Sequence, residues 1–262
     1  MTLLADVNPS WERPYPPHKV VGNLYYVGTE DLACFLITTP EGHILINTGL
    51  KDSTPILRAG ITKLGFKMED VKILLTMQVH YDHVAALAEV QKITSAKVFV
   101  TEADAPILED GGHSDPSFGK TGWFAPVKVD RRLKDGDTVR LGGTELKVIL
   151  TPGHTKGSVS YMMTVEEGGK KQSVAIVNLP SVVMPLFGNA YYPNIVADFE
   201  KSFARLKKLS PDIWVAGHAS QYGMAGKREA GSFVDPAGYK KAVAEYEAAF
   251  HKKLEEERPK KK

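Results

Sequence analysis

Short apolar runs rich in valine, isoleucine, leucine and aromatic residues recur along the first half of the chain, each bounded by glycine, asparagine or other polar residues. This pattern is typical of buried strands. The strands expected there are Leu24–Val27, Cys34–Ile37, Ile44–Ile46, Val71–Leu75 and Lys97–Val100. Apolar residues at helical spacing between them predict helices at 51–65, 84–90 and 103–109.

The second half alternates apolar and polar positions on either side of two glycine pairs, a pattern that predicts two β-hairpins. The first joins Thr138–Leu141 to Glu145–Leu150 at Gly142-Gly143, and the second joins Val159–Val165 to Val174–Val177 at Gly168-Gly169. A further strand is expected at Ile213–Ala216, between helices at 196–208 and 236–257.

Each half therefore contains several strands with flanking helices. We expect an α/β fold in which two packed sheets are covered by helices on their outer faces, an αββα four-layer sandwich. Residues 1–262 are predicted to form one domain. Four prolines predict an extended arm over residues 1–18, and residues 236–262 should form a helix and a basic tail.

A long segment, residues 110–126, is rich in glycine, serine, aspartate and proline. It contains the aromatic residues Phe118, Trp123 and Phe124. Loops of this length in compact domains are usually functional or mobile. The aromatic residues favour a loop that packs on the molecule, over the mouth of a site.

Composition and charge narrow the possible partners. The chain has 262 residues, of which 43% are apolar and 24% charged, as in an ordinary globular protein. Its 33 basic and 31 acidic residues give a net charge of +2, which argues against a concentrated basic face for nucleic acid. Cys34 is the single cysteine, so no internal disulfide can form, and a buried apolar position is expected for it.

No stretch approaches the ~20 apolar residues needed to span a bilayer, so no membrane partner is expected. The first residues lack the basic start and the long apolar core of a signal peptide. We therefore expect a cytosolic chain, or a mature form whose leader was replaced by Met1.

Candidate chemistry is concentrated in the turn between the strand Val71–Leu75 and the helix that follows it. Gln78, His80, Asp82 and His83 all lie in this turn. In an extended segment His80 and Asp82 would point to the same side, and the turn would bring in His83 from the other side. Asp82 could serve only as a helix cap, but its position between two histidines favours a metal ligand.

Two further histidines, His154 and His218, also directly follow predicted strands, with glycine in the adjoining turn. Strands that end at one edge of a sandwich would bring both next to the first turn. Imidazoles with one carboxylate form a donor set that suits Zn²⁺, and a coordination position left for water marks a catalytic site. The remaining histidines are expected in ordinary core or surface positions: His18, His43, His113 and His251.

Three segments, Gln78–His83, Pro152–Thr155 and Gly217–Gln221, together resemble the metallo-β-lactamase superfamily. The resemblance covers nearly the whole chain, from about Trp11 to about Ala249. It implies the αββα sandwich of that superfamily and a hydrolytic zinc enzyme.

The last of these segments resembles subclass B3, as do Gly111–Asp115 and Asp235–Tyr239. Within B3 the chain is similar to the GOB-type enzymes. They share glutamine at the first ligand position and segments like Asn178–Ser181 and Tyr192–Ile195.

The resemblance implies one or two zinc ions per chain. It assigns Gln78, His80 and His154 to one site, and Asp82, His83 and His218 to the other. A zinc-bound hydroxide would attack the amide carbonyl of a β-lactam (a penicillin, cephalosporin or carbapenem), and zinc would polarise that carbonyl. Asp82 would be both ligand and catalytic residue, because it can orient the attacking water.

Two positions depart from the common B3 pattern. The amide oxygen of Gln78 is neutral and a poorer zinc donor than imidazole, so its site should bind zinc more weakly and the site of Asp82 should fill first. Leu179 stands where B3 enzymes have the first of two serines. Ser181 is expected to keep the second serine as a contact to the substrate carboxylate.

Between Glu167 and Asp198 the chain has no acidic residue. Glyoxalase II, lactonase, tRNA 3′-processing and di-iron members of the superfamily bridge their metals with an acid from this segment, so its absence favours the lactamase branch. Two alternatives stay open: another zinc hydrolase of this fold, acting on a lactone, ester or phosphodiester, or a zinc-binding protein that has lost catalysis, motivated by Gln78. The resemblance further implies a monomeric, periplasmic protein that confers antibiotic resistance.

Overall fold

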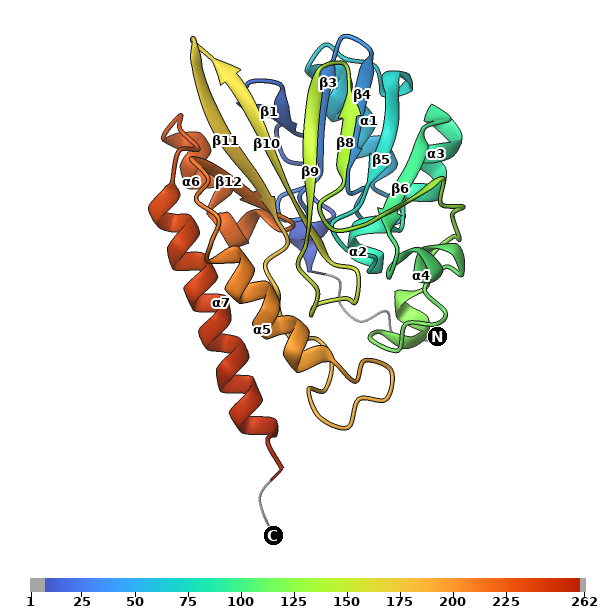
Figure 1. Cartoon of the computed structure of the whole chain (residues 1–262). Helices are drawn as coiled ribbons and strands as arrows, with labels where there is room; N and C mark the ends of the chain where they lie inside the picture. The colour runs from blue at the N-terminus through green and yellow to red at the C-terminus, as the bar shows by residue number, and fades with distance from the viewer. Residues whose placement is uncertain (1–7, 260–262) are drawn as a thin grey trace.

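Two β-sheets packed face to face form the centre of the molecule, and helices cover both outer faces (Figure 1). The computed structural model describes residues 8–259. Within this range one sheet has seven strands in the order β1-β2-β3-β4-β5-β6-β7, and the other has five in the order β12-β11-β10-β9-β8. The expected αββα four-layer sandwich is confirmed.

Strand direction changes within each sheet. In the first sheet β1 to β4 pair antiparallel and β4 to β7 pair parallel, whereas in the second only β11 and β12 are parallel. The first sheet contains β1 (His18–Val21), β2 (Leu24–Tyr26), β3 (Phe35–Thr39), β4 (Gly42–Ile46), β5 (Val71–Leu75), β6 (Lys97–Thr101) and β7 (Arg131–Leu133). The second contains β8 (Thr138–Leu141), β9 (Thr144–Leu150), β10 (Val159–Glu167), β11 (Lys170–Val177) and β12 (Ile213–Ala216).

Two strands, β1 and β7, were not expected from the sequence. β1 begins at His18, where the proline-rich arm was expected to end; residues 1–7 of that arm lie outside the described residues, and a short 3₁₀ helix, η1 (Pro9–Trp11), follows them. β7 carries two exposed arginines, Arg131 and Arg132, and lies at the edge of its sheet. Edge strands often carry charged side chains, so β7 lacks the apolar run by which the other strands were predicted.

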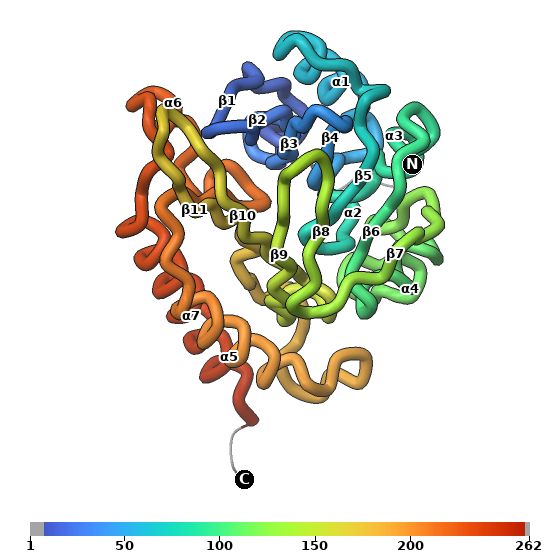
Figure 2. Tube along the Cα trace, turned by 45° about the horizontal axis from the view of Figure 1, so that its top comes forward, coloured from blue at the N-terminus to red at the C-terminus, as the bar shows by residue number. Residues whose placement is uncertain are grey.

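Helices cover the outer face of each sheet (Figure 2). The first sheet is covered by α1 (Thr54–Lys63) and α3 (Leu87–Thr94), with α4 (Ala105–Glu109) after β6, and the second by α5 (Ile195–Leu206) and α7 (Pro236–Glu257). The short α6 (Met224–Glu229) was not expected, because six residues are too few for a helical period to be recognised. Among the described residues no helix has the length and apolarity to cross a bilayer. Residues 260–262 of the basic tail lie outside the described range.

The helix expected over residues 84–90 is divided in two. α2 (Tyr81–Val84) begins inside the turn, and α3 begins only at Leu87. Asp82 therefore lies in the first helical turn, and the expectation of an extended segment carrying His80 and Asp82 is wrong. His80 occupies the N-cap position of α2, so Asp82 does not cap this helix.

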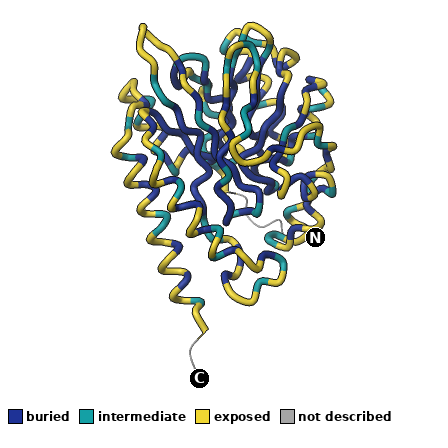
Figure 3. The backbone as a smooth tube through the Cα atoms, in the orientation of Figure 1, coloured by how far each residue is buried: buried dark blue, intermediate teal, exposed yellow. Residues whose placement is uncertain are grey.

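Alternation along the central strands divides their side chains between two apolar cores. In β4, Ile44 and Ile46 belong to the core between the sheets, whereas Leu45 belongs to the core beneath α1 and α3. In β5, Leu75 belongs to the core between the sheets and Leu74 to the core beneath the helices. A shift of one residue in strand pairing would turn each side chain toward the opposite core, so this alternation fixes the register of the strands. Figure 3 shows the buried strands between exposed helix surfaces.

Backbone hydrogen bonds join the two sheets at the edge where β5 and β12 end. The N–H group of Ala33, before β3, donates to the carbonyl of Gly217, after β12, at 3.0 Å. The N–H group of Val159, at the start of β10, donates to the carbonyl of Met77, after β5, at 2.9 Å. These bonds fix the turn after β5 relative to the second sheet.

Gly153, in the turn after β9, lies directly against α5. Its φ is +134°, and a Cβ atom there would lie 2.9 Å from the ring of Phe199. We predict that Gly153→Ala lowers the free energy of unfolding by about 2–4 kcal/mol, because it adds backbone strain and overpacking. Chemical denaturation measures this loss.

Gly136→Ala is the matched control for this variant. Gly136 has φ +80° but has nothing within 4 Å of an added Cβ, so its substitution strains the backbone without a clash. Gly136→Ala should therefore lower the free energy of unfolding clearly less than Gly153→Ala does. Equal losses in the two variants would contradict a steric contribution from Phe199.

Candidate metal centre

The turn after β5 buries four polar side chains. Gln78 and His80 are each 2% exposed, Asp82 is 7% exposed and His83 is 3% exposed. A hydrogen bond of 2.7 Å from the N–H group of Thr48 to the carbonyl of His83 ties the turn to the loop after β4. Buried polar groups are costly unless each has a partner, so their contacts define what this turn can bind.

Asp82, His83 and His218 form a compact cluster whose candidate ligand atoms all lie within 4.8 Å of one another. Asp82 Oδ2 is 3.1 Å from His83 Nε2 and 3.5 Å from His218 Nε2. The two imidazole rings are nearly perpendicular, at 88°, with centroids 5.0 Å apart. The structure therefore brings together the three residues predicted for one zinc site, two from α2 and one from the loop after β12.

His80 and His154 form a second pair, whose Nδ1 and Nε2 atoms face each other at 3.0 Å. Gln78, the third residue predicted for this site, accepts a hydrogen bond from the N–H group of His80 through its side-chain oxygen at 2.7 Å. An amide oxygen has two lone pairs, so one stays available for a metal. The two groups thus differ in charge, because only the cluster of Asp82 contains a carboxylate.

Burial and neighbouring charges set the protonation of these groups. Burial and the nearby His80 lower the pKa of His154 to about 3, and burial also lowers the pKa of His83. Both imidazoles are therefore neutral near neutral pH, which is the form that binds metals. Burial would raise the pKa of Asp82, but His83 and His218 hold it well below its ordinary value.

His218 differs from the other histidines of the centre. Burial lowers its pKa, but hydrogen bonds to Asp31 and Asp82 outweigh burial and raise this pKa to about 9. Its ring therefore contributes a positive charge opposite the buried Asp82 carboxylate. A metal cation in the cluster would take the place of the Nε2 proton.

The donor set fits zinc. Facing donor atoms are 3.0 to 3.5 Å apart, which is close to the separation of neighbouring ligands around a tetrahedral ion with bonds of about 2.0–2.2 Å. Imidazole nitrogen and carboxylate oxygen are donors that zinc accepts in proteins. The residues present can therefore hold the ion that the sequence predicted.

Further groups hold the outward nitrogens of the first pair. His154 Nδ1 lies 3.0 Å from both the backbone carbonyl and the hydroxyl oxygen of Ser181. His80 Nε2 is 3.2 Å from Asp115 Oδ2, an ion-pair distance without hydrogen-bond alignment. Phe118 packs edge-on against His80, with ring centroids 4.9 Å apart. The loop over residues 110–126 thus contacts the centre, while the predicted role of Ser181 toward substrate stays a prediction.

Sequence reasoning missed several residues that contact the candidate ligands, among them Asp31 and Asn47. Asp31 Oδ2 lies 3.0 Å from His218 Nδ1, and the side-chain nitrogen of Asn47 lies 3.2 Å from His83 Nδ1. Asn47 directly follows β4, and the predicted ligands likewise lie in segments that follow strands. Its position could therefore have marked it as a residue of the centre. Asp31 lies in a loop between strands, where no pattern in the sequence distinguishes it.

A buried carboxylate holds the loop that carries His154. Asp104, shortly after β6, accepts hydrogen bonds from the hydroxyl of Thr155 and from the N–H group of Gly157, both at 2.8 Å. Burial raises the pKa of Asp104 to about 6, although these hydrogen bonds act in the opposite direction. This carboxylate therefore positions His154 relative to the first sheet.

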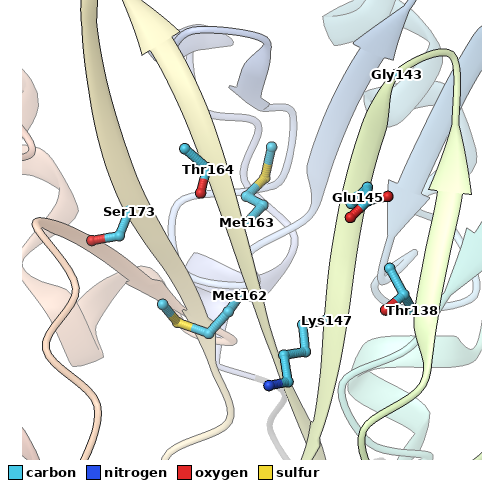
Figure 4. Close-up of a pocket in the computed structure, with 8 residues that line it drawn as sticks. All are labelled: Thr138, Gly143, Glu145, Lys147, Met162, Met163, Thr164 and Ser173. Atoms are coloured by element: carbon cyan, nitrogen blue, oxygen red, sulfur yellow. The ribbon is translucent and has the colours of Figure 1, made fainter.

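Other features of the surface lie apart from this centre. A shallow hollow of about 530 Å³ lies on the outer face of the second sheet, and its lining includes Lys147, Met162 and Ser173 but none of the candidate ligands (Figure 4). The four histidines that were not predicted as ligands each pack against an aromatic ring instead.

A family model described as the metallo-beta-lactamase superfamily matches residues 28–163, which is more than half of the chain. The chain belongs to the metallo-β-lactamase superfamily. The matched region contains every candidate ligand from Gln78 to His154, while His218 lies beyond it. The resemblance recognised in the sequence is confirmed.

Solved structures of superfamily members match nearly the whole chain. A β-lactamase from Chitinophaga pinensis is 42% identical, with a TM-score of 0.92, over 97% of this chain and 100% of that one. The metallo-β-lactamase GOB-18 from Elizabethkingia meningoseptica is 43% identical, with a TM-score of 0.92, over 96% of both chains. LRA-12 from an Alaskan soil metagenome, described as a class B3 di-zinc metallo-β-lactamase, is 44% identical, with a TM-score of 0.90, over 94% of this chain and 97% of that one.

Curated relatives of this superfamily member are more distant. A hydroxyacylglutathione hydrolase from Rhodopseudomonas palustris (strain BisB5) is 29% identical over 129 residues, which are 49% of this chain and 42% of that protein. A probable metallo-hydrolase, YqgX, from Bacillus subtilis (strain 168) is 30% identical over 156 residues, 58% of this chain and 64% of that protein. The chain thus spans less than two thirds of the length of each of these relatives.

The buried carboxylate of Asp104 predicts a pH-dependent contribution to stability. Because its folded-state pKa is raised from 3.8 to about 6, this contribution is present below pH 3.8 and is lost as the pH rises through about 6. Across this window the unfolding free energy of the chelator-treated wild type should fall by about 3 kcal/mol relative to Asp104→Asn, which cannot ionise. Denaturant unfolding on either side of the window measures the difference.

Glu102→Gln removes an exposed carboxylate two residues away and serves as the control. It should keep the pH profile of the wild type. Parallel pH profiles for the wild type and Asp104→Asn would show that Asp104 is not the titrating group.

Proposed function

We propose that this chain is a zinc-dependent β-lactamase that hydrolyses the cyclic amide bond of penicillins, cephalosporins and carbapenems. The observation that carries the proposal is its similarity to three solved β-lactamases, at 42% to 44% identity over at least 94% of the chain. The donor set supports it, because six candidate ligands gather in two groups at one edge of the sandwich.

The proposal gives each candidate ligand a place. Gln78, His80 and His154 would hold one zinc ion, and Asp82, His83 and His218 would hold the other. Bound zinc supplies a Lewis acid for the lactam carbonyl and lowers the pKa of a coordinated water to roughly 7, so no nucleophilic side chain is needed.

Asp82 is proposed as the catalytic residue as well as a ligand. Its low pKa keeps the carboxylate ionised, so it accepts hydrogen bonds and does not donate them. Asp82 can therefore accept a hydrogen bond from the attacking water and direct the water oxygen toward the lactam carbonyl. Its contacts with His83 and His218 fix the direction of the carboxylate.

Substrate contacts are proposed on the loops around the centre. Ser181, which already lies beside His154, is proposed to contact the substrate carboxylate. Trp123 and Phe187 are 41% and 37% exposed, which is high for large apolar side chains. They offer apolar surface on the two loops where we expect the substituents of the lactam to bind.

A second candidate, hydrolysis of an ester by the same centre, is favoured by the match to a hydroxyacylglutathione hydrolase. Residues 168–197 count against it, because they contain no acidic residue that could bridge two metals. Leu179 in this segment is 1% exposed and belongs to the apolar core. A zinc-binding protein without catalysis, the third possibility, is disfavoured because five of the six donors are imidazole or carboxylate groups.

We propose further that residues 1–262 form one domain, that the protein acts as a monomer in the periplasm, and that it contributes to antibiotic resistance. These proposals rest on the resemblance to B3 enzymes.

The purified chain supplied with zinc is predicted to open the ring of a chromogenic cephalosporin and of a carbapenem, and a chelator should abolish this turnover. A spectrophotometric assay measures both. Absence of turnover by zinc-replete protein would contradict the proposal. Turnover of a hydroxyacylglutathione thioester instead would favour the second candidate.

Two variants control this assay. Asp82→Ala should lower kcat by more than about 100-fold. Removal of a residue that only hydrogen-bonds a ligand typically lowers activity about 10–100-fold, and removal of a ligand itself should lower it further. Asp52→Ala, at an exposed carboxylate in the loop before α1, should retain full turnover. Retained turnover in a folded Asp82→Ala protein would place the catalytic centre elsewhere.

The neutral amide of Gln78 predicts two zinc sites of unequal affinity. Gln78→His should tighten the weaker site by about tenfold or more, because imidazole is the better donor. Competitive chelator titration measures this, with Gln91→His on α3 as the control for adding a histidine. Anomalous diffraction at limiting zinc should place the first ion beside Asp82, and a first ion between His80 and His154 would refute the order.

A further inference from the structure

His218 is held by a carboxylate from the opposite end of the chain. Its Nδ1 atom lies 3.0 Å from Oδ2 of Asp31, in the loop between β2 and β3. Its other ring nitrogen, Nε2, lies 3.5 Å from Asp82 Oδ2. An ionised carboxylate only accepts hydrogen bonds, so Nδ1 carries a proton and Nε2 is the nitrogen that faces the candidate metal position.

Asp31 is itself fixed by three further hydrogen bonds. Its Oδ1 atom accepts from the N–H group of Ser220 at 2.9 Å, and its backbone carbonyl accepts from the N–H group of Ala219 at 2.7 Å. Its Oδ2 atom also accepts from the indole N–H of Trp11 at 3.0 Å. The carboxylate therefore cannot rotate away from His218 without breaking its bonds to Ser220 and Trp11, while the backbone bond to Ala219 holds the loop in place.

Trp11 belongs to the N-terminal arm, which docks on the same loop. The N–H group of Asp31 donates to the carbonyl of Ser10 at 3.2 Å, next to the tryptophan. The indole ring of Trp11 also lies beside the imidazole of His218, with centroids 5.6 Å apart. The arm thus contacts both the carboxylate and the histidine that this carboxylate orients.

We propose that Asp31, clamped by Trp11, is a positioning residue that fixes the tautomer and ring plane of His218. The N-terminal arm thereby sets the metal affinity of the cluster that His218 forms with Asp82 and His83. This inference rests on the proposed metal-binding role of that cluster.

Among residues 8–259, the other candidate ligands have no aligned carboxylate on their outward ring nitrogens. His154 is held by the oxygens of Ser181, and His83 by the side-chain nitrogen of Asn47. Within the described part of the chain, His218 is therefore the ligand whose donor strength depends most directly on the charge of its partner.

Asp31→Asn is the sharpest test, because it exchanges one carboxylate oxygen for an amide nitrogen. The carboxylate accepts N–H groups from Ser220, Trp11 and His218, whereas an amide offers only one acceptor oxygen to them. In either orientation of the amide, His218 loses the anionic acceptor that makes its imidazole a stronger zinc donor. Loss of such a partner typically lowers metal affinity about 10–100-fold.

Zinc affinities of the full chain would be measured by competition with a chromophoric chelator. Asp31→Asn should weaken one site about 10–100-fold and leave the other unchanged. Trp11→Phe keeps an aromatic ring but lacks the indole N–H, so it should weaken the same site by a smaller factor. Asp31→Glu keeps a carboxylate and should recover part of the affinity that Asp31→Asn loses.

Glu30→Gln is the matched control. Glu30 is the adjacent carboxylate, pairs with Arg13 at 2.6 Å and contacts none of the candidate ligands. Its variant should bind zinc like the wild type. A loss as large as that of Asp31→Asn would assign the effect to the general charge of the loop and overturn the inference.

NMR of nitrogen-15-labelled histidine rings tests directly whether Asp31 acts on the ring of His218. A residue that only stabilised the fold would leave the ring signals of His218 unchanged. In the zinc-loaded wild type the Nδ1–H proton of His218 should show the strong downfield shift of a hydrogen bond to a carboxylate, and Asp31→Asn should reduce that shift. Zinc affinity of Asp31→Asn within about twofold of the wild type, or an unchanged Nδ1–H shift of His218, would overturn the inference. If Asp31→Asn does not fold, Trp11→Phe decides by the same two measurements. Both report metal binding, so a failure of β-lactam turnover leaves this test intact.

Discussion

Backbone hydrogen bonds between the two sheets hold the donor atoms of this molecule in one place. The bonds from Ala33 to Gly217 and from Val159 to Met77 join the turn after β5 to the ends of the second sheet. The candidate ligands come from both sides of this junction, and neither sheet alone carries a complete group. The apolar core that packs the sheets together is therefore a condition of the chemistry as well as of the fold.

The fold could be predicted where strands are buried on both faces. Val71–Leu75 and Ile213–Ala216 are almost wholly apolar, and their observed bounds equal the predicted ones. Prediction failed where tertiary position overrides local pattern. The edge strand β7 carries two arginines, and α2 begins at Tyr81 inside a segment that ligand spacing suggested was extended. Both depend on neighbours that are distant in the sequence.

The candidate centre was predictable because its donors share one local signal, polar side chains in the turns that follow strands, with histidine in each of these turns. The groups that orient those donors share no such signal. Asp31 and His218 are 187 positions apart, and only the packing of the sheets makes them neighbours. Asp104 likewise supports His154 from another strand. The candidate ligands can therefore be predicted from local sequence, whereas the residues that orient them can be found only from the whole fold.

The distance between Asp31 and His218 along the chain also makes the cluster of Asp82 depend on both ends of the fold. With the roles proposed above, a chain that ends before β12 (Ile213–Ala216) keeps Gln78, His80 and His154 but lacks His218. Zinc held by the carboxylate cluster therefore reports that the last strand is in place beside the loop of Asp31.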